Sequence, residues 1–192
     1  LYKGKFHHRD SLGIDQWIEP GAVNLMTAGH GITHSERIDG DALAAPYTLS
    51  GIQTWLALPK DHEDDAPAFE HAPKEALPMI EGEGKRLRLI LGTAYGERAP
   101  VETASEMFYA DAVLEPGAVL PMPNDHEDRG GYVVEGSVFS GGQEFTAGQM
   151  FVYRPGDAVA LKAGEQGARL MILGGETLEG SRYIWWNFVA SS

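Results

Sequence analysis

The chain has 192 residues, which is long enough for one large or two small domains with cores of their own. It carries 28 acidic and 15 basic residues, a formal net charge of −13, so direct binding to nucleic acid or to an anionic membrane is disfavoured. Cysteine is absent, which excludes disulfides, thiolate metal sites and a cysteine nucleophile and fits a reducing, cytoplasmic location. No apolar run approaches the roughly 20 residues that a membrane-spanning helix needs.

The first half of the chain is predicted to be mostly β-structure. Short runs of alternating polar and apolar residues are separated by Gly and Pro, and no segment shows sustained helical periodicity. One strand is expected at residues 6–9, and a half-buried strand at residues 50–58, where every second residue is apolar or Thr. Residues 60–78 contain an acidic run without periodicity, which predicts a surface loop.

The second half of the chain continues this alternation. Strands are predicted at residues 86–91 and 107–114, with a loop at residues 92–104 between them. Further strands are predicted at residues 150–153, 169–173 and 183–189. The last of these is expected to be a single strand with Ile184, Trp186 and Phe188 on one face.

A short motif is repeated along the chain. Glu19-Pro-Gly-Ala-Val23 recurs as Glu115-Pro-Gly-Ala-Val119, and Arg154-Pro-Gly156 is a shorter copy. Pro fixes φ at the second position of a turn, and Gly tolerates the positive φ that the third position of such a turn requires. The repetition predicts two similar β units in tandem, with the boundary between them inside residues 92–104.

The strongest candidate for chemistry is His34-Ser-Glu36. Residues i and i+2 of a strand point to the same face, so this segment would present an imidazole and a carboxylate together. Gly29 and Gly31, just before it, allow the tight backbone bend that directs these two side chains to one side. The two donors suit divalent iron, manganese, nickel, copper or zinc. A His-x-Glu triplet alone also fits a solvated strand end, and that alternative stays open.

The other histidines have simpler interpretations. His7 and His8 are neighbours on a predicted strand, so one is expected to face inward as a hydrogen-bonded wall residue and the other outward. His126 lies among residues typical of a turn, which favours an exposed polar loop over a metal ligand. The remaining histidines are expected to be exposed to solvent: His30, His62 and His71.

Four stretches of the sequence together resemble one known family. They are His8-Arg-Asp-Ser-Leu-Gly13, Met26-Thr-Ala-Gly-His-Gly-Ile-Thr-His34-Ser-Glu36, Gly51-Ile-Gln-Thr-Trp-Leu-Ala-Leu-Pro59 and Arg182-Tyr-Ile-Trp-Trp-Asn-Phe-Val189. On these residues the chain resembles the pirins, two-domain members of the cupin superfamily of β-barrels. The stretches span the chain almost end to end, so the likeness does not depend on a single motif.

The resemblance implies an all-β fold of two tandem cupin-type barrels of the double-stranded β-helix, or jelly-roll, kind. Residues 1–98 would form the N-terminal barrel, which lacks its first strands and carries the remnant of a metal site. Residues 99–192 would form a C-terminal barrel without metal ligands. In the family a helix also follows the last strand, so the chain is expected to be truncated at both ends.

The resemblance also implies a metal site in the N-terminal barrel. Family members hold one ion there, typically iron, through three histidines and one glutamate, and His34 and Glu36 fall on the last two of these positions. The other two belong to a His-Pro-His segment that would precede Leu1. Because a stable site needs at least three protein ligands, the chain on its own is expected to bind metal weakly and to show a solvated wall at His34 and Glu36.

The function implied by the resemblance is that of a metal-dependent dioxygenase. With Fe(II) as the expected metal, the full-length protein would open the central ring of a flavonol-like molecule with O2, as in quercetin 2,3-dioxygenase activity. His34 would hold the metal, and Glu36 would be a ligand or the base that takes the proton of the 3-hydroxyl group. The alternative is a metal- or redox-sensing regulatory protein that acts through a protein partner. The third interpretation is a structural bicupin that has lost its catalytic activity.

Overall fold

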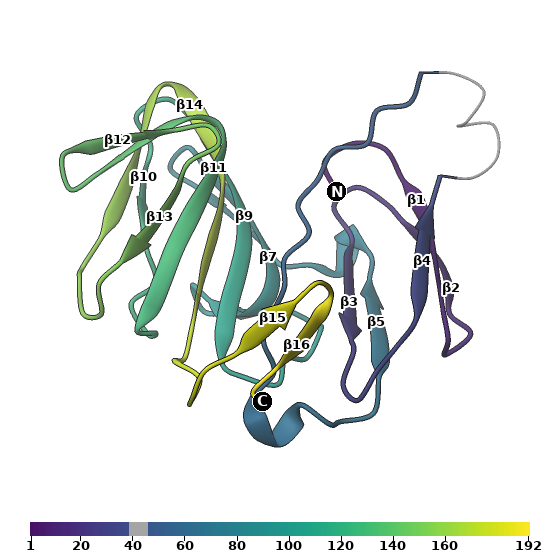
Figure 1. Ribbon diagram of the computed structural model, residues 1–192. Coiled ribbons are helices and arrows are strands. Elements are labelled where there is room, and N and C mark those ends of the chain that lie inside the picture. The colour runs from purple at the N-terminus through teal and green to yellow at the C-terminus, as the bar shows by residue number, and fades with distance from the viewer. Residues whose placement is uncertain (39–45) are drawn as a thin grey trace. The chain divides into compact units, whose positions relative to one another are not determined.

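The computed structural model describes residues 1–38 and 46–192, and every structural statement below concerns those residues. Contacts divide the chain into two compact units. Unit 1 comprises Leu1–Ala76 and Leu178–Ser192, and unit 2 comprises Leu77–Thr177. Apart from two 3-10 turns, Lys60–His62 and Lys74–Ala76, the regular elements of the described ranges are β-strands, and the predicted all-β class is confirmed (Figure 1). No helix in these ranges is long and apolar enough to cross a membrane.

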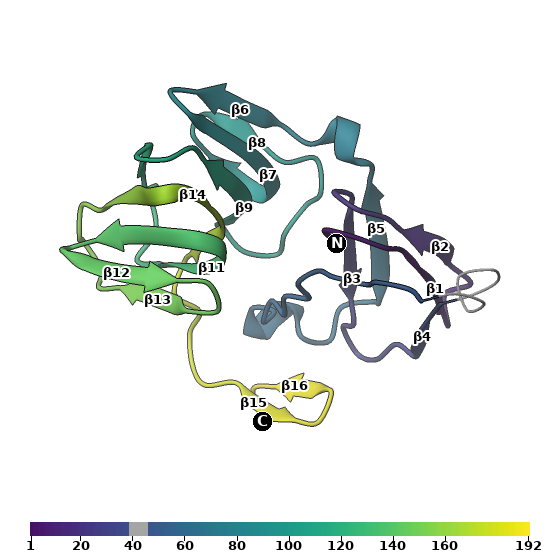
Figure 2. The same ribbon diagram turned by 90° about the horizontal axis from the view of Figure 1, so that it is seen from above.

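Unit 1 is built from three small antiparallel sheets. The largest has the order β2-β1-β4, and the others pair β3 with β5 and β15 with β16. The strands are β1 (Phe6–Asp10), β2 (Asp15–Ile18), β3 (Val23–Thr27), β4 (His34–Arg37), β5 (Ala68–Ala72), β15 (Tyr183–Trp185) and β16 (Phe188–Ala190). β1 lies between β2 and β4, so β4 forms one edge of its sheet (Figure 2).

Unit 2 contains one antiparallel sheet of nine strands whose main path runs β12-β11-β14-β9-β7-β6. β10 adds to β14, β13 adds to β11 and β8 adds to β7, and Figure 2 shows these strands from above. The strands are β6 (Met79–Gly82), β7 (Lys85–Ala94), β8 (Glu97–Arg98), β9 (Met107–Leu114), β10 (Val119–Pro121), β11 (Asp128–Ser140), β12 (Gln143–Thr146), β13 (Met150–Tyr153) and β14 (Ala160–Gly175).

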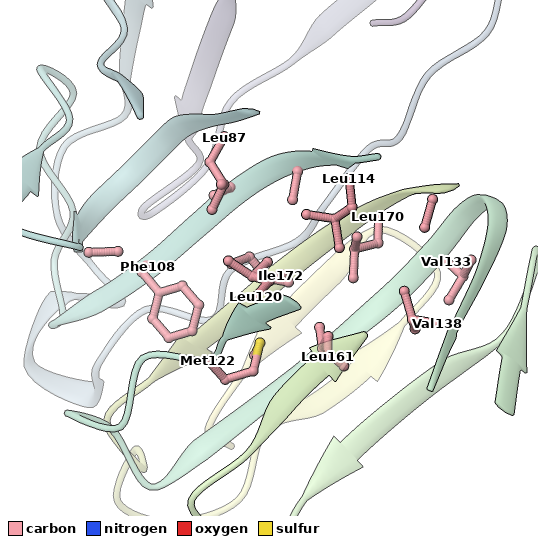
Figure 3. Packing of buried hydrophobic residues seen from close by; sticks show 14 of the residues in the cluster. Leu87, Phe108, Leu114, Leu120, Met122, Val133, Val138, Leu161, Leu170 and Ile172 are labelled. Atoms are coloured by element: carbon pink, nitrogen blue, oxygen red, sulfur yellow. The ribbon is translucent and has the colours of Figure 1, made fainter. Parts of the chain in front are cut away.

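The hydrophobic core of unit 2 lies on the inner face of this sheet. On β9 every second residue is apolar and buried, beginning at Phe108 and ending at Leu114, and these side chains meet Leu170 and Ile172 of β14 (Figure 3). Burying one such side chain stabilises the fold by roughly 1.5–3 kcal/mol. Tyr109 and Asp111 on the other face of β9 are also buried, so β9 is a largely buried central strand of the sheet.

The repeated Pro-Gly motif forms the same turn three times. Gly21, Gly117 and Gly156 all have positive φ, of 82°, 74° and 83°. In each copy the amide after the glycine hydrogen-bonds to the carbonyl three residues earlier, with N···O distances of 3.4, 3.0 and 3.4 Å. In the first two copies a strand, β3 or β10, starts two residues after the glycine. The repeat thus reflects a shared turn geometry in both units.

Contacts divide the chain at other positions than the expected domain boundary. The sequence placed the division between residues 98 and 99, whereas contacts divide the chain between Ala76 and Leu77 and return it to unit 1 at Leu178. The reason is β7, which pairs with β9 from Lys85 to Gly92 and so joins the sheet of unit 2.

Two predicted strands differ from the structure. Residues 51–59 form no strand, and the only pairing described nearby is the isolated bridge between Ser50 and Lys3. Residues 183–189 form a hairpin, not a single strand, with its turn at Trp186, where φ is 54°. Alternation predicts a strand only where a partner strand accepts its hydrogen bonds, and that partner is set by tertiary structure.

The segment predicted as an acidic loop also contains a strand. β5 lies inside residues 60–78 and pairs with β3 from Val23 opposite Ala72 to Thr27 opposite Ala68. Its short length and mixed composition hid it from the sequence pattern. The pairing matters because it brings Phe69 close to the candidate site.

Val138 and Val152 provide a matched test of the core. Val138 on β11 is fully buried, whereas Val152 on β13 is 71% exposed. Val138→Ala should lower the free energy of unfolding by roughly 1.5 kcal/mol or more, because two buried methyl groups are lost. Val152→Ala should lower it by less than roughly 0.5 kcal/mol. Urea denaturation followed by circular dichroism measures both values, and equal losses would contradict the assigned core.

Candidate metal site

His34 and Glu36 lie on the same face of the edge strand β4. Both side chains are exposed, whereas Ser35 between them is half-buried. β4 pairs with β1 so that Asp10 stands opposite His34 and His8 opposite Glu36. Directly opposite residues of an antiparallel pair project to the same face. Two imidazoles and two carboxylates therefore share one side of the sheet.

His8 and Asp10 form the buried half of this group. The side chains of His8 and Asp10 are 3% and 0% exposed, and His8 Nε2 donates a hydrogen bond to Asp10 Oδ2 at 3.1 Å. The other oxygen of Asp10 accepts hydrogen bonds from the amides of Leu12 and Ile14, at 2.9 and 3.1 Å. Asp10 therefore closes the turn between β1 and β2 and fixes the ring of His8 at the same time.

The ionisation of Asp10 is decided by two opposing effects. Burial acts to raise the pKa of its carboxyl group, but the hydrogen bonds from His8, Ile14 and Leu12 together outweigh burial, so the pKa lies below its ordinary value. The carboxylate is thus the stable form at neutral pH. A charged Asp10 keeps both of its oxygens as acceptors for this network.

The ring of His8 contacts two other rings. It stacks on His34 with the ring centroids 5.6 Å apart and on Phe69 of β5 at 4.7 Å. Its position is therefore fixed by Asp10, His34 and Phe69 together. The imidazole of His34 is exposed, but it stacks on the ring of His8, whose position these contacts fix.

The donor set fits a divalent metal in kind but is incomplete in number. Imidazole and carboxylate are suitable ligands for such ions. Within the described parts of the chain, however, no group of three His, Asp or Glu residues is placed to hold one. His8 and Asp10 lie on the same face, but their hydrogen bond and those to Leu12 and Ile14 already engage them. His34 and Glu36 are the two donors of this group that remain exposed.

His7 occupies the opposite face of β1. It is 7% exposed, stacks on Trp17 with the centroids 4.6 Å apart, and hydrogen-bonds to Asp15. Asp15 also accepts a hydrogen bond from Arg9 Nε at 3.0 Å. Hydrogen bonds from His7 and Arg9 lower the pKa of Asp15. The expectation that one of the two adjacent histidines would face solvent is therefore wrong, because Trp17 covers the outward one.

The loop before β4 is held by Asp65. The backbone amide of His30 and its Nδ1 both donate hydrogen bonds to the carbonyl oxygen of Asp65, at 3.0 and 3.1 Å. Gly29 has φ of +50°, and a Cβ there would lie 1.9 Å from the same oxygen. This glycine is required by a close backbone approach, which sets the path of the chain into β4.

A shallow hollow of about 330 Å³ lies beside His34. It is lined by six residues, all of them polar: Arg9, Asp10, Ser11, Thr33, His34 and Ser35. Binding sites for aromatic molecules usually have apolar and aromatic walls. The hollow gives solvent and small polar molecules access to His34, while the apolar wall expected around a flavonol is not among these six residues.

The histidines outside the site have identifiable partners. In unit 2, His126 is half-buried and stacks on Phe108 at 6.0 Å, so the expectation of an exposed loop residue holds only in part. In unit 1, His71 Nδ1 donates to Asn24 Oδ1 at 2.8 Å, and His62 Nδ1 donates to Asp65 Oδ2 at 2.7 Å.

The sequence pattern found His34 and Glu36 but missed His8 and Asp10 as their neighbours. A signal was present, since His8-Arg-Asp10 has the same i, i+2 spacing as His34-Ser-Glu36. The spacing shows that each pair shares a face. It does not show that the two pairs share the same face, because that depends on the register of β1 and β4.

Gly29 and Gly13 provide a matched test of the loop geometry. Both have positive φ, but a Cβ at Gly13 would meet nothing within 4 Å. Gly13→Ala should cost only the penalty of a left-handed residue, roughly 1–2 kcal/mol. Gly29→Ala should cost clearly more, because the new methyl group displaces Asp65. Denaturation of both variants measures the difference, and similar costs would show that the approach to Asp65 is not constrained.

The pair His62 and Asp65 predicts a pH dependence. The hydrogen bond that His62 donates to Asp65 and the charge of Asp65, with a smaller effect of Asp61, raise the pKa of His62 above 6.5. Since the folded-state pKa is raised, the stabilisation is fully present below about pH 6.5 and is lost as the pH rises through the folded-state value. NMR titration should show the pKa of His62 falling in Asp65→Asn and changing little in the control Asp64→Asn. An unchanged value in Asp65→Asn would contradict the pairing.

Comparison with known proteins identifies the family. The profile of the family described as Pirin matches residues 1–56, and the profile of the Pirin C-terminal cupin domain matches residues 109–192. A pirin-like protein of Caulobacter vibrioides is 43% identical over 194 residues, which cover 100% of this chain and 66% of that protein. A relative from Pseudomonas aeruginosa is 37% identical over 194 residues, which are 59% of its length. The chain thus spans less than two thirds of the length of these relatives.

Solved structures give the same result. The crystal structure of a quercetin 2,3-dioxygenase from Acinetobacter baumannii is similar to 99% of this chain with a TM-score of 0.85, at 34% sequence identity, and the match covers 62% of that protein. A match of this quality over nearly all residues confirms the predicted architecture of tandem cupin-type β-barrels. Because pirin profiles match both ends of the sequence and the fold agrees throughout, the chain belongs to the pirin family of cupin proteins.

Proposed function

We propose that the protein is a metal-dependent dioxygenase of the quercetin 2,3-dioxygenase type, which opens the central ring of a flavonol-like molecule with O2. The observation that carries the proposal is the pair His34 and Glu36, an imidazole and a carboxylate exposed on one face of β4. It is supported by the 34% identity to the quercetin 2,3-dioxygenase of A. baumannii. The activity belongs to the whole protein, because this chain covers only part of the length of its relatives.

Fe(II) is the proposed metal, and Mn, Ni, Cu and Zn share the same donor preferences closely enough to be tested beside it. His34 and Glu36 would supply two ligands. The resemblance implies that a His-Pro-His segment supplies the others, which would complete the set of at least three that a stable site needs. When bound, a divalent ion at this position acts as a Lewis acid and lowers the pKa of a phenolic hydroxyl group beside it.

The two side chains have different roles in this proposal. The neutral imidazole of His34 offers a nitrogen lone pair, and stacking on His8 fixes the plane of its ring. Glu36 is exposed at a sheet edge, so its carboxylate can turn toward a substrate and accept the proton of the 3-hydroxyl group on Oε. His8 and Asp10 contribute by holding the wall, not by touching the substrate.

The alternative from the sequence is a metal- or redox-sensing regulator that binds a protein partner. The observation that favours it is the aromatic surface of the hairpin β15–β16, where Trp185, Trp186 and Phe188 are 76%, 84% and 63% exposed. Exposed aromatic residues are typical of protein interfaces. The two proposals differ in outcome, because a regulator binds metal without opening a flavonol ring. We place the protein in the cytoplasm under either proposal, since it uses no cysteine.

Substitution of His34 and Glu36 in the full-length protein tests the proposal. His34→Ala should remove metal and activity together, because the remaining ligands no longer suffice. Glu36→Gln should keep some metal, since an amide oxygen coordinates weakly, but should lose about 10²–10⁴-fold in rate because it cannot accept a proton. Elemental analysis and a flavonol ring-opening assay measure the two quantities.

His71→Ala is the matched control. His71 also lies in unit 1 and is exposed, with its ring bound to Asn24, so its loss should leave both metal and rate unchanged. Equal loss of metal in His34→Ala and Glu36→Gln would refute a base role of Glu36 separate from ligation. A wild-type protein that holds metal but opens no flavonol ring would favour the regulator.

A further inference from the structure

A second polar hollow lies in unit 2, on the outer face of its sheet. It encloses about 90 Å³ and is lined by Met79, Arg86, Arg88, Asp111, Val113 and Arg169. Three of these six residues are arginines and one is acidic, although the whole chain carries a net charge of −13. The proposed dioxygenase function does not involve this region.

The strand register explains why these side chains gather. Arg88 of β7 stands opposite Asp111 of β9, and Val113 stands between Arg86 on one side and Arg169 of β14 on the other. Leu87 and Leu89 point into the core, so the arginines between and beside them point outward. Four neighbouring positions on three strands thus place three guanidinium groups around one small apolar side chain.

The single carboxylate in the lining is already engaged. Arg169 donates to Asp111 twice, from Nε at 2.9 Å and from a terminal nitrogen at 2.6 Å. This two-point contact satisfies both oxygens of Asp111 and holds the side chain of Arg169 across the hollow. Arg86 and Arg88 therefore remain as the positive charges that face the hollow without a carboxylate of the lining left to neutralise them.

The side chain of Arg88 has a buried hydrogen-bond donor that lacks an acceptor. Its Nε is shielded from solvent and has no hydrogen-bond partner among the described residues. Buried donors are rarely left unsatisfied, and each such group needs an explanation such as a bound ion or water. A guanidinium group presents its donors in one plane, a geometry that matches the two oxygens of a carboxylate or phosphate group.

We propose that this hollow binds one small oxyanion, a phosphate or carboxylate group, between Arg86 and Arg88 with Arg169 at its rim. A volume of about 90 Å³ has room for one such group. Glu81 and Glu135 stand opposite Arg86 and Arg169 in the register but do not line the hollow. They flank the site and limit it to a single anionic group.

The test is a titration of the chain with inorganic phosphate at constant ionic strength, with acetate as a second arm. Amide NMR shifts on β7 and β9 report where binding occurs. Arg88→Gln and Arg86→Gln should each weaken phosphate binding by about tenfold or more, because each removes a charged donor. Both variants leave the pair Asp111–Arg169 intact, and Arg86 is exposed, so at least that variant should fold normally.

Arg154→Gln is the matched control, since it removes one exposed guanidinium group from a turn elsewhere in unit 2. It should leave binding within about threefold of the wild type, as expected for a screened, distant charge. Tighter binding of phosphate than of acetate assigns the site to phosphate groups, and the reverse assigns it to carboxylates. The proposal is overturned if neither anion shifts β7 and β9 at millimolar concentration, or if Arg154→Gln weakens binding as much as Arg88→Gln.

Discussion

The antiparallel pairing of β1 with β4 is the interaction on which the candidate site depends. It sets Asp10 opposite His34 and His8 opposite Glu36, and so decides which side chains share a face. A slip of one residue would turn His34 and Glu36 away from their supports, because the side chains of a strand alternate between faces. Asp10 closes the turn after β1 with its carboxylate, while its partner His8 packs on the ring of His34 of β4. The same residue therefore shapes the hairpin and supports the wall.

The parts of this arrangement that are local in sequence could be predicted, and the parts that depend on strand pairing could not. The spacing of His34 and Glu36 places them on one face whatever the rest of the chain does, and the strand predicted at residues 107–114 has the bounds observed for β9. Local information also sufficed for the Pro-Gly turns. The role of His8, in contrast, needs the register of β1 and β4, which are separated in sequence by β2 and β3.

The sequence-based predictions that differ from the structure have a common cause. Residues 51–59 alternate well but do not pair as a strand within the described residues, and β5 alternates poorly but pairs with β3 along its whole length. The burial of His7 depends on Trp17, which reaches it across a hairpin. Each case shows that a partner from elsewhere in the chain, not the intrinsic pattern, decides whether a segment becomes a strand and which of its faces is covered.

The two units are stabilised in different ways, and this bears on how the site responds to a ligand. Unit 2 has a continuous hydrophobic core, whereas the buried apolar residues in the described part of unit 1 are Ile18, Val23 and Ala72. Polar contacts replace a core there. Arg182 donates to the carbonyl of Leu58 at 2.9 Å and pairs with Glu63 at 3.0 Å, and hydrogen bonds from Ser191 with the charge of Arg182 lower the pKa of Glu63.

Under the proposed function, an ion held by His34 and Glu36 would bind only the folded arrangement of β4, so its binding energy would add to the stability of unit 1. Asp10 holds the ring of His8, and His8 in turn stacks on the ring of His34. The ring of His34 is therefore already positioned before an ion binds, so binding would have to order fewer side chains. If the proposed site binds metal, metal affinity and the stability of unit 1 would therefore depend on the same network, and a substitution that loosens the turn at Asp10 would weaken both.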